Sequence, residues 1–161
     1  MLDQVAAQFR EAMRRVAATV NIVTIADDNK PMGMTATAVS SLSFDPPSLL
    51  VCVNQSASMH DSLALASHFC VNVLHQDQLA LSRTFSDSKL RDIRFGGDEW
   101  RRDGDGPPYV FNAQASLICE RSQLIAFGTH TICIGTIVSV RTRDDIDPLV
   151  YLDGKFGSLA D

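Results

Sequence analysis

Small and hydroxyl-bearing side chains alternate through residues 33–43, whose sequence is GMTATAVSSLS. Small side chains let a ligand approach the backbone, and Thr and Ser hydroxyls can bond to the carbonyls of a flat heterocycle. The exposed amides of a loop can also form a concavity that binds anions such as phosphate. The segment predicts a strand that leads into a ligand-binding loop, while a hydroxyl-rich edge strand facing water would explain the same residues.

A second polar cluster, NQSAS at residues 54–58, follows an apolar strand expected over 48–54. Ser58 and Asp61 have the spacing of a capping box with a shorter acid, so a short helix is expected to begin there. Free N–H groups at a helix start favour a phosphate, and a capping role for Ser58 is compatible with phosphate binding. Two such clusters at the ends of neighbouring strands could enclose one ligand.

Aromatic and imidazole groups occur at two further predicted turns. His130 follows Gly128 and Thr129 before a long strand, and its ring could hold a phosphate of a second nucleotide or lie on the surface without a ligand. Tyr151 and Phe156 flank an Asp-Gly turn. These rings could stack on a flat cofactor or pack against each other across two strands, and both interpretations stay open.

Several kinds of chemistry are not indicated by any motif. The chain has no GxGxxG after a strand, no GxSxG and no HExxH, so neither a Rossmann nucleotide site nor hydrolysis is predicted. The cysteines lack CxxC spacing and are interpreted as buried free thiols, and the histidine separations do not suggest a metal site. These cysteines are Cys52, Cys70, Cys119 and Cys133, and these histidines are His60, His68 and His75. We assign no catalytic and no metal-binding residue.

Length and charge restrict the class of protein further. The 161 residues, 45% of them hydrophobic and 20% charged, predict one well-packed domain over residues 1–161. The net charge of -5 provides no field for a nucleic acid backbone. No uninterrupted apolar run reaches the roughly 18 residues that cross a bilayer, so no membrane partner and a cytoplasmic location are expected.

Strands joined by hairpins, without regular βαβ alternation, predict a mainly antiparallel β-barrel with short helices. An opening helix capped by Asp3 should bury one stripe formed by Val5, Phe9, Met13 and Val16. Strands are expected over 20–26, 32–39, 48–54, 69–74, 113–120, 131–142 and 149–153, the first three adjacent. Short helices are expected around 63–65 and over 76–85, and residues 86–109 should be mostly loop.

The clusters, in this order and over nearly the whole chain, resemble the short-chain flavin reductase family. That family includes reductase components of two-component flavin monooxygenases and related corrinoid reductases. The resemblance is carried by residues 9–10, 20–24, 35–39, 41, 43, 46–47, 53–58, 69–74, 94–95, 128–130 and 148–151. It implies a split β-barrel homodimer that holds FMN or FAD near its interface and takes hydride from NADH or NADPH.

The resemblance also implies roles for individual residues. Hydride would reach the flavin N5, so no protein acid or base is required. One departure is Phe156-Gly157, where family members often carry a Tyr-His pair, and it affects the nicotinamide side. The implied contacts are Thr35, Ala36, Thr37, Ala38 and Ser41 with the isoalloxazine and ribityl chain, Asn54, Ser56, Ala57 and Ser58 with the phosphate, and His130, Tyr151 and Phe156 with the nicotinamide.

Three functions stay open from the sequence. The leading hypothesis is an NAD(P)H-dependent flavin reductase that hands reduced flavin to a partner monooxygenase, with NADH favoured because no basic pocket for a 2′-phosphate is evident. A second is a flavoprotein that reduces a cobalt corrinoid in cobalamin synthesis. The third is a module that binds flavin or haem without turnover, since one fold can host several functions.

Overall fold

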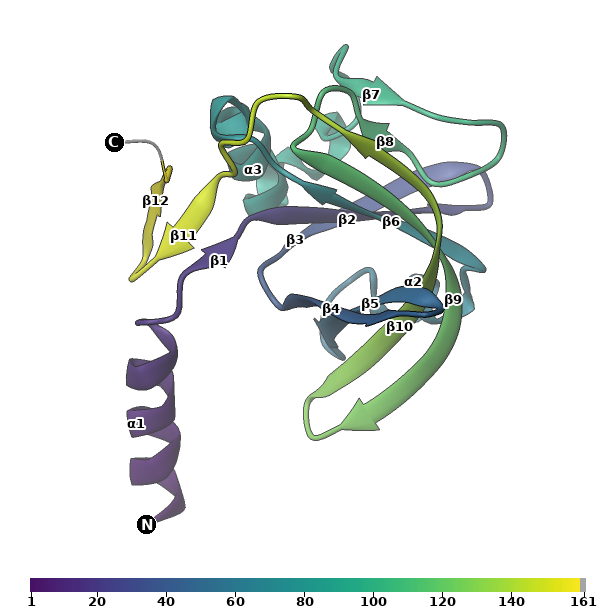
Figure 1. Cartoon of the computed structure of the whole chain (residues 1–161). Coiled ribbons are helices and arrows are strands. Elements are labelled where there is room, and N and C mark those ends of the chain that lie inside the picture. The colour runs from purple at the N-terminus through teal and green to yellow at the C-terminus, as the bar shows by residue number, and fades with distance from the viewer. Residues whose placement is uncertain (160–161) are drawn as a thin grey trace.

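The computed structural model describes residues 1–159, and a seven-stranded antiparallel sheet that curls into a barrel dominates it (Figure 1). This confirms the predicted mainly antiparallel β fold. In sheet order the strands are β3 (Lys30–Ala36), β2 (Asn21–Asp27), β6 (His68–Val73), β9 (Ala115–Phe127), β10 (His130–Thr142), β5 (Pro47–Asn54) and β4 (Val39–Phe44).

The barrel is split between β3 and β4, which follow each other in the chain yet form opposite edges of the sheet. Thr37 and Ala38 connect them, and we call these two residues the seam. The Cys52 N–H donates to the Ala38 carbonyl at 3.0 Å, which ties the seam to β5. The expectation that the strand over 48–54 lies beside the first hairpin is therefore wrong, because the seam carries the chain to the far edge.

Apolar residues cover both faces of the central strands, which explains their unbroken hydrophobic sequence. On β2, Val23 packs inside the barrel with Val51 and Phe69. Ile22 points the other way and packs with Phe85 of α3 (Leu79–Ser86), the predicted helix over 76–85. The η1 turn (Gln76–Gln78) precedes α3, and α2 (His60–Leu65) covers one end of the barrel core.

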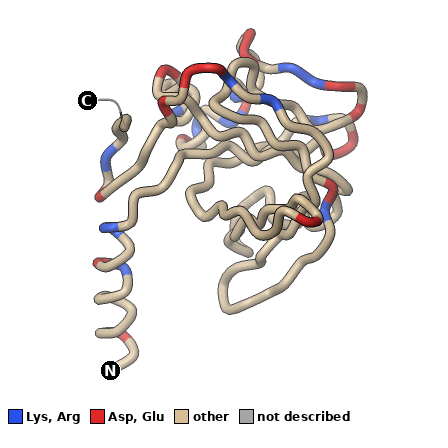
Figure 2. Tube along the Cα trace, in the orientation of Figure 1, with Lys and Arg blue, Asp and Glu red and all other residues tan. Residues whose placement is uncertain are grey.

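The β9–β10 hairpin is longer than predicted and projects beyond the barrel (Figure 1). A register shift at Ile134/Gly135 bends it, and a Cβ on Gly135 would lie 2.6 Å from atoms of Phe69 and Cys119. Residues 122–140 contain no Lys, Arg, Asp or Glu (Figure 2). Phe127 at the tip of the hairpin is 82% exposed, so residues 122–140 present an uncharged, partly apolar surface.

The segment after α3 packs against the barrel although sequence patterns predict mostly loop. It contains η2 (Ser88–Ile93), β7 (Trp100–Arg101) and β8 (Tyr109–Val110). The Arg94 guanidinium donates to the Gly33 carbonyl at 3.1 Å and to the Phe85 carbonyl at 2.8 Å. These bonds hold the segment against the outer side of β3.

The opening helix α1 (Leu2–Met13) forms as predicted but stands away from the barrel (Figure 1). Within the described chain none of its residues is buried, and Val5 and Phe9 are 57% and 62% exposed. The predicted burial of its stripe is therefore wrong for a single chain. Asp3 lies inside the first turn while Met1 occupies the capping position, so the predicted cap is also wrong.

A small sheet connects α1 to the barrel. In it β1 (Ala18–Thr19) pairs with β11 (Val150–Leu152), which pairs with β12 (Lys155–Gly157). Asp153 and Gly154, with φ of 51° and 76°, form the tight turn predicted from the Asp-Gly dipeptide. No helix among residues 1–159 has the length and apolar content needed to span a membrane.

A charged cluster fixes the connection that leads to β11. Arg143 donates to Asp77 at 2.8 Å and to Asp145 at 2.5 Å, and buried His75 lies between the same two carboxylates. Burial alone would raise the pKa of Asp77, but hydrogen bonds with Arg143 and His75 outweigh it and hold the pKa below its usual value. The cluster anchors the chain before β11 and so positions Tyr151.

Candidate functional site

A pocket of about 710 Å³ lies between α1, the seam and the β11–β12 hairpin. This volume is within the range of small-molecule sites, roughly 300–1,000 Å³. It brings together Thr37, Ala38 and Tyr151 from the predicted contacts, which come from distant parts of the sequence. Its lining consists of Phe9, Arg10, Met13, Arg14, Val16, Ala18, Thr37, Ala38, Tyr151, Asp153 and Gly154.

The hydroxyl-rich segment 33–43 differs in secondary structure and exposure along its length. Thr35 and Ala36 end β3, where the buried Asn21 side chain donates to the Ala36 carbonyl at 3.0 Å. The seam residues after them are exposed. Ser41 lies further on, exposed on edge strand β4. The predicted loop is therefore only the short seam, and the residues on both sides of it belong to the edge strands β3 and β4.

The 54–58 cluster forms a tight turn at the end of β5. The Asn54 Oδ1 accepts from the Ser56 N–H at 2.9 Å and from the Ser56 hydroxyl at 2.8 Å, while the Ala57 N–H donates to the Asn54 carbonyl at 2.9 Å. Ser58 is exposed and precedes Met59, which is the residue at the capping position of α2. The predicted cap by Ser58 is therefore wrong, and its hydroxyl faces solvent.

His130 lies with the 54–58 cluster rather than with the aromatic pair. It is the β10 partner of Asn54, and its Nδ1 is 2.9 Å from the Thr129 hydroxyl. Tyr151 and Phe156 pack across the β11–β12 hairpin with ring centroids 5.3 Å apart and planes at 64°. The cross-strand pair left open by the sequence is present, and Tyr151 also lines the pocket.

Two pocket residues were given no role by sequence reasoning. Arg10 in α1 and Arg14, the residue that caps its C-terminus, both line the pocket. Arg14 donates to Asp153 Oδ1 from Nε at 2.9 Å and from a terminal nitrogen at 2.8 Å. The sequence could have indicated this pairing, because Arg10 and Arg14 have the i, i+4 spacing that places two side chains on one side of a helix, next to Phe9. Their placement depends on where α1 lies, which helical periodicity does not determine.

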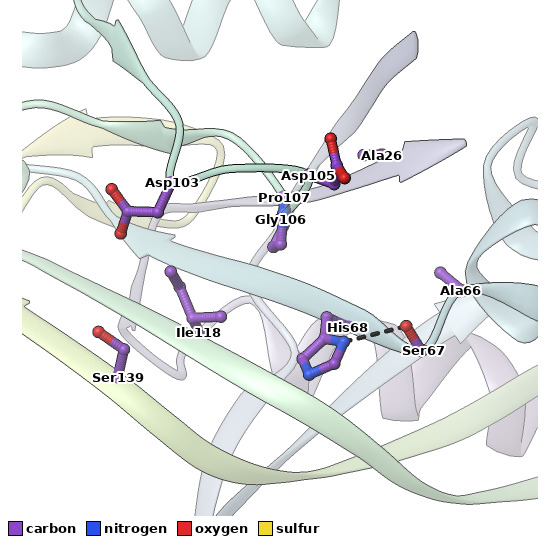
Figure 3. Close-up of a pocket in the computed structure, with 10 residues that line it drawn as sticks. All are labelled: Ala26, Ala66, Ser67, His68, Asp103, Asp105, Gly106, Pro107, Ile118 and Ser139. Atoms are coloured by element: carbon purple, nitrogen blue, oxygen red, sulfur yellow. Dashed lines mark hydrogen bonds between the residues drawn. The ribbon is translucent and has the colours of Figure 1, made fainter. Parts of the chain in front are cut away.

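A second pocket, of about 490 Å³, lies on another part of the barrel (Figure 3). Figure 3 shows Asp103 and Asp105 at its rim and His68, whose Nδ1 is 2.9 Å from the Ser67 hydroxyl. The carboxylates would repel a phosphate, and the residues that line it include no predicted flavin contact. The pocket at the seam is therefore the better candidate for a nucleotide.

Three of the four cysteines have buried thiols that resist ionisation. Burial raises the pKa of Cys119 to about 12 and that of Cys133 to about 11, and burial also raises the pKa of Cys70. Cys52 is half-buried, and all four thiols are free, as predicted. A thiol with a raised pKa is a poor nucleophile at neutral pH.

Comparison with known proteins identifies relatives over most of the chain. The reductase component of an FADH(2)-dependent resorcinol hydroxylase from Rhizobium sp. (strain MTP-10005) is 42% identical over 156 residues, covering 96% of this chain and 87% of the relative. The FMN reductase (NADH) RutF of Pseudomonas syringae pv. syringae (strain B728a) is 38% identical over 151 residues, covering 94% and 85%.

Solved structures lead to the same group. The NADH:FAD oxidoreductase SgcE6 of Streptomyces globisporus C-1027 superposes with a TM-score of 0.87 at 29% identity, covering 97% of this chain and 88% of that one. The same oxidoreductase in complex with NAD and FAD fragments gives a TM-score of 0.88, also at 29% identity, covering 96% and 93%. The model of the flavin reductase like domain matches residues 13–160. The chain therefore belongs to the flavin reductase like domain family.

Proposed function

We propose that this protein is an NADH-dependent flavin reductase that transfers hydride from NADH to FMN or FAD and passes the reduced flavin to a partner oxygenase. The observation that carries the proposal is the pocket at the seam, where Thr37, Ala38 and Tyr151 meet. Relatives named as an FMN reductase and as a reductase component, over 94% and 96% of this chain, support the same function.

The residues around the seam suit a flavin. Small residues Ala18 and Ala38 leave room for a flat ring, and the Thr37 hydroxyl can bond to its polar edge. When bound, a flavin supplies the hydride-accepting chemistry, and the protein supplies orientation and hydrogen-bond donors. We assign the ring and ribityl side to Thr35, Ala36, Thr37, Ala38 and Ser41, the phosphate side to Asn54, Ser56, Ala57 and Ser58, and the nicotinamide side to His130, Tyr151 and Phe156.

The test is anaerobic oxidation of NADH by the purified protein with FMN, FAD or a cob(II)alamin analogue in turn. Rapid loss of NADH absorbance with either free flavin is the expected result. Faster oxidation with the corrinoid would favour a cobalt reductase, and no oxidation with any acceptor would favour a binding module for flavin or haem. The named relatives favour neither of these two alternatives.

Replacing Ser56 by aspartate is expected to weaken FMN binding about tenfold to a hundredfold, because the new carboxylate would face the phosphate. Ser56 is exposed and its turn is held by Asn54, so the fold should tolerate the change. Fluorescence titration with FMN and with riboflavin measures the effect. Riboflavin lacks the phosphate, so its affinity should stay the same.

Ser88→Asp is the matched control, since Ser88 is exposed at the start of η2 in another segment. It should bind FMN like the unmodified protein. Equal weakening of FMN and riboflavin by Ser56→Asp would mean that the substitution disturbs the turn rather than a phosphate contact. Unchanged FMN affinity would remove Ser56 from the phosphate side.

We also propose a homodimer in which a second copy covers the exposed apolar surfaces of this chain. The α1 stripe and the uncharged part of the β9–β10 hairpin, residues 122–140, support it, because contiguous exposed apolar surface usually marks an interface. Phe127→Glu should halve the mass measured by light scattering, while Phe111→Glu, at an exposed phenylalanine outside both surfaces, should leave it unchanged. A monomeric unmodified protein would contradict the proposal.

The four free thiols and the use of NADH support a cytoplasmic location, which we include in the proposal. Reducing compartments keep such thiols reduced. The partner oxygenase follows from the relative that is the reductase component of a hydroxylase.

A further inference from the structure

Asn21 is a fully buried amide at the point where the chain passes from the small sheet to the large one. It is the first residue of β2, and only Val20 separates it from Thr19, the last residue of β1. Alternation along β2 places its side chain on the same face as Val23, which packs inside the barrel. The amide therefore lies at the end of the barrel core, where the two sheets meet.

The side-chain nitrogen of Asn21 joins the two sheets. Its Nδ2 donates to the Thr19 carbonyl at 3.1 Å and to the Ala36 carbonyl at 3.0 Å. Ala36 ends β3 in the large sheet, whereas Thr19 belongs to β1 in the small sheet. An amide nitrogen carries two hydrogens, so one side chain can serve both carbonyls at once.

The two carbonyls adjoin different parts of the pocket at the seam. Thr37, which follows Ala36, lines the pocket, and so do Ala18 and Tyr151, which are partners in the β1–β11 pair. In the proposed function the seam holds the flavin ring and Tyr151 lies on the nicotinamide side. Asn21 therefore connects the strand end that leads to the flavin contacts with the strand pair that carries the nicotinamide contact.

The stability of the barrel core alone does not explain an amide at this position. The Asn21 Oδ1 is buried and, among residues 1–159, has no hydrogen-bond partner. A buried oxygen without a partner is unfavourable for folding, and an apolar side chain would avoid that cost. What the asparagine adds is the pair of hydrogen bonds between the two sheets.

Resting on the proposed function, we propose that Asn21 is a positioning residue that sets the placement of the flavin ring relative to the nicotinamide. It touches neither ring, because its side chain is buried, and it acts through the backbone of Thr19 and Ala36. Transfer between two bound reactants depends steeply on geometry, and a misplacement of about 1 Å can cost about a hundredfold in rate. Loss of the link should slow hydride transfer more than it weakens flavin binding, since the flavin keeps its other contacts.

The test compares Asn21→Leu with Thr24→Val. Leucine has nearly the shape of asparagine and removes both donors. Thr24 is also fully buried on β2, its hydroxyl donates to the Pro108 carbonyl at 2.5 Å, and it does not line the pocket at the seam. Each variant thus removes a buried polar group from the same strand. Asn21→Thr is the milder variant should Asn21→Leu fail to fold, because one hydroxyl can serve only one of the two carbonyls at a time.

Two quantities separate positioning from binding. Fluorescence titration gives the dissociation constant of FMN, and anaerobic stopped flow gives the rate of hydride transfer at saturating FMN and NADH. Asn21→Leu should lower that rate about tenfold and leave the dissociation constant within about threefold. Asn21→Thr should lower the rate by a smaller factor. Thr24→Val should match the unmodified protein in both quantities although its melting temperature falls.

Hydrogen–deuterium exchange of the protein without ligands tests the link itself. Residues 36–38 and the β1–β11 pair should exchange faster in Asn21→Leu than in Thr24→Val. Unchanged exchange, an unchanged rate of hydride transfer, an equal fall in rate for Thr24→Val, or a loss of FMN affinity as large as the loss of rate would each overturn the positioning role. Absence of NADH oxidation by the unmodified protein would instead overturn the proposed function, and the positioning role with it, even if the exchange results confirm the link.

Discussion

Replacing Asn72 by leucine should lower the free energy of unfolding by about 3–5 kcal/mol, because each buried polar group left without a partner costs roughly 1–3 kcal/mol. Asn72 on β6 is fully buried. Its Oδ1 accepts from the Val110 N–H at 2.8 Å and from the Ser116 hydroxyl at 2.9 Å, and its Nδ2 donates to the Ile22 carbonyl at 3.0 Å. One side chain thus joins β2, β6, β8 and β9, and leucine can replace none of these bonds.

Thermal or urea unfolding measures the loss, and for a chain of this size the midpoint should fall by roughly 6–20 °C. Ser116→Ala is the graded comparison. It removes one hydrogen bond to Asn72 and should cost only about 1 kcal/mol. Equal effects of the two substitutions would contradict the view that Asn72 is the centre of this network.

The largest effect on ligand binding is expected for Thr37→Trp. Thr37 is exposed at the seam and lines the pocket, so an indole there would occupy the volume assigned to the flavin ring. Flavin affinity should fall at least about a hundredfold, equivalent to about 2.7 kcal/mol. Stability should change by less than about 0.5 kcal/mol, since an exposed side chain is replaced.

Thr142→Trp is the control for Thr37→Trp. Thr142 is an exposed threonine at the end of β10, away from the seam. Flavin titration and NADH oxidation with Thr142→Trp should match the unmodified protein. If Thr37→Trp binds flavin normally while folding normally, the flavin site does not include the pocket at the seam.

The parts of the fold that depend on short-range chemistry could be predicted from the sequence. The turn after β2 has Asp28 and Asn29 at φ of 45° and 64°, a conformation that Asp and Asn tolerate better than most residues, and it was predicted from their types. The Asp-Gly turn at 153–154 was predicted for the same reason. Sheet order was not, because the pairing of β5 with β10 joins residues about 80 positions apart in sequence.

The candidate site was predicted only in part, because it also depends on contacts between segments that are distant in the sequence. Hydroxyl and small side chains near Thr37 indicate ligand chemistry by their type alone. Arg10 on an amphipathic helix resembles any surface cation until the helix is placed beside the seam. Periodicity identifies the apolar stripe of α1 but not what covers it, since a stripe buried in the same chain and one buried by a partner have the same spacing.

The split in the barrel has a thermodynamic consequence. At the seam, β3 and β4 are joined by the chain itself rather than by a strand ladder, and the Cys52–Ala38 hydrogen bond ties the seam only to β5. This is where local opening should require the least free energy, and where backbone amides should exchange with solvent sooner than those of β2 or β6. A flavin bound to both Thr35 and Ser41 would span this gap. Opening would then occur only in molecules without flavin. The exchange of the Cys52 amide with solvent would therefore slow as the occupied fraction of the site increases, and it would report that occupancy.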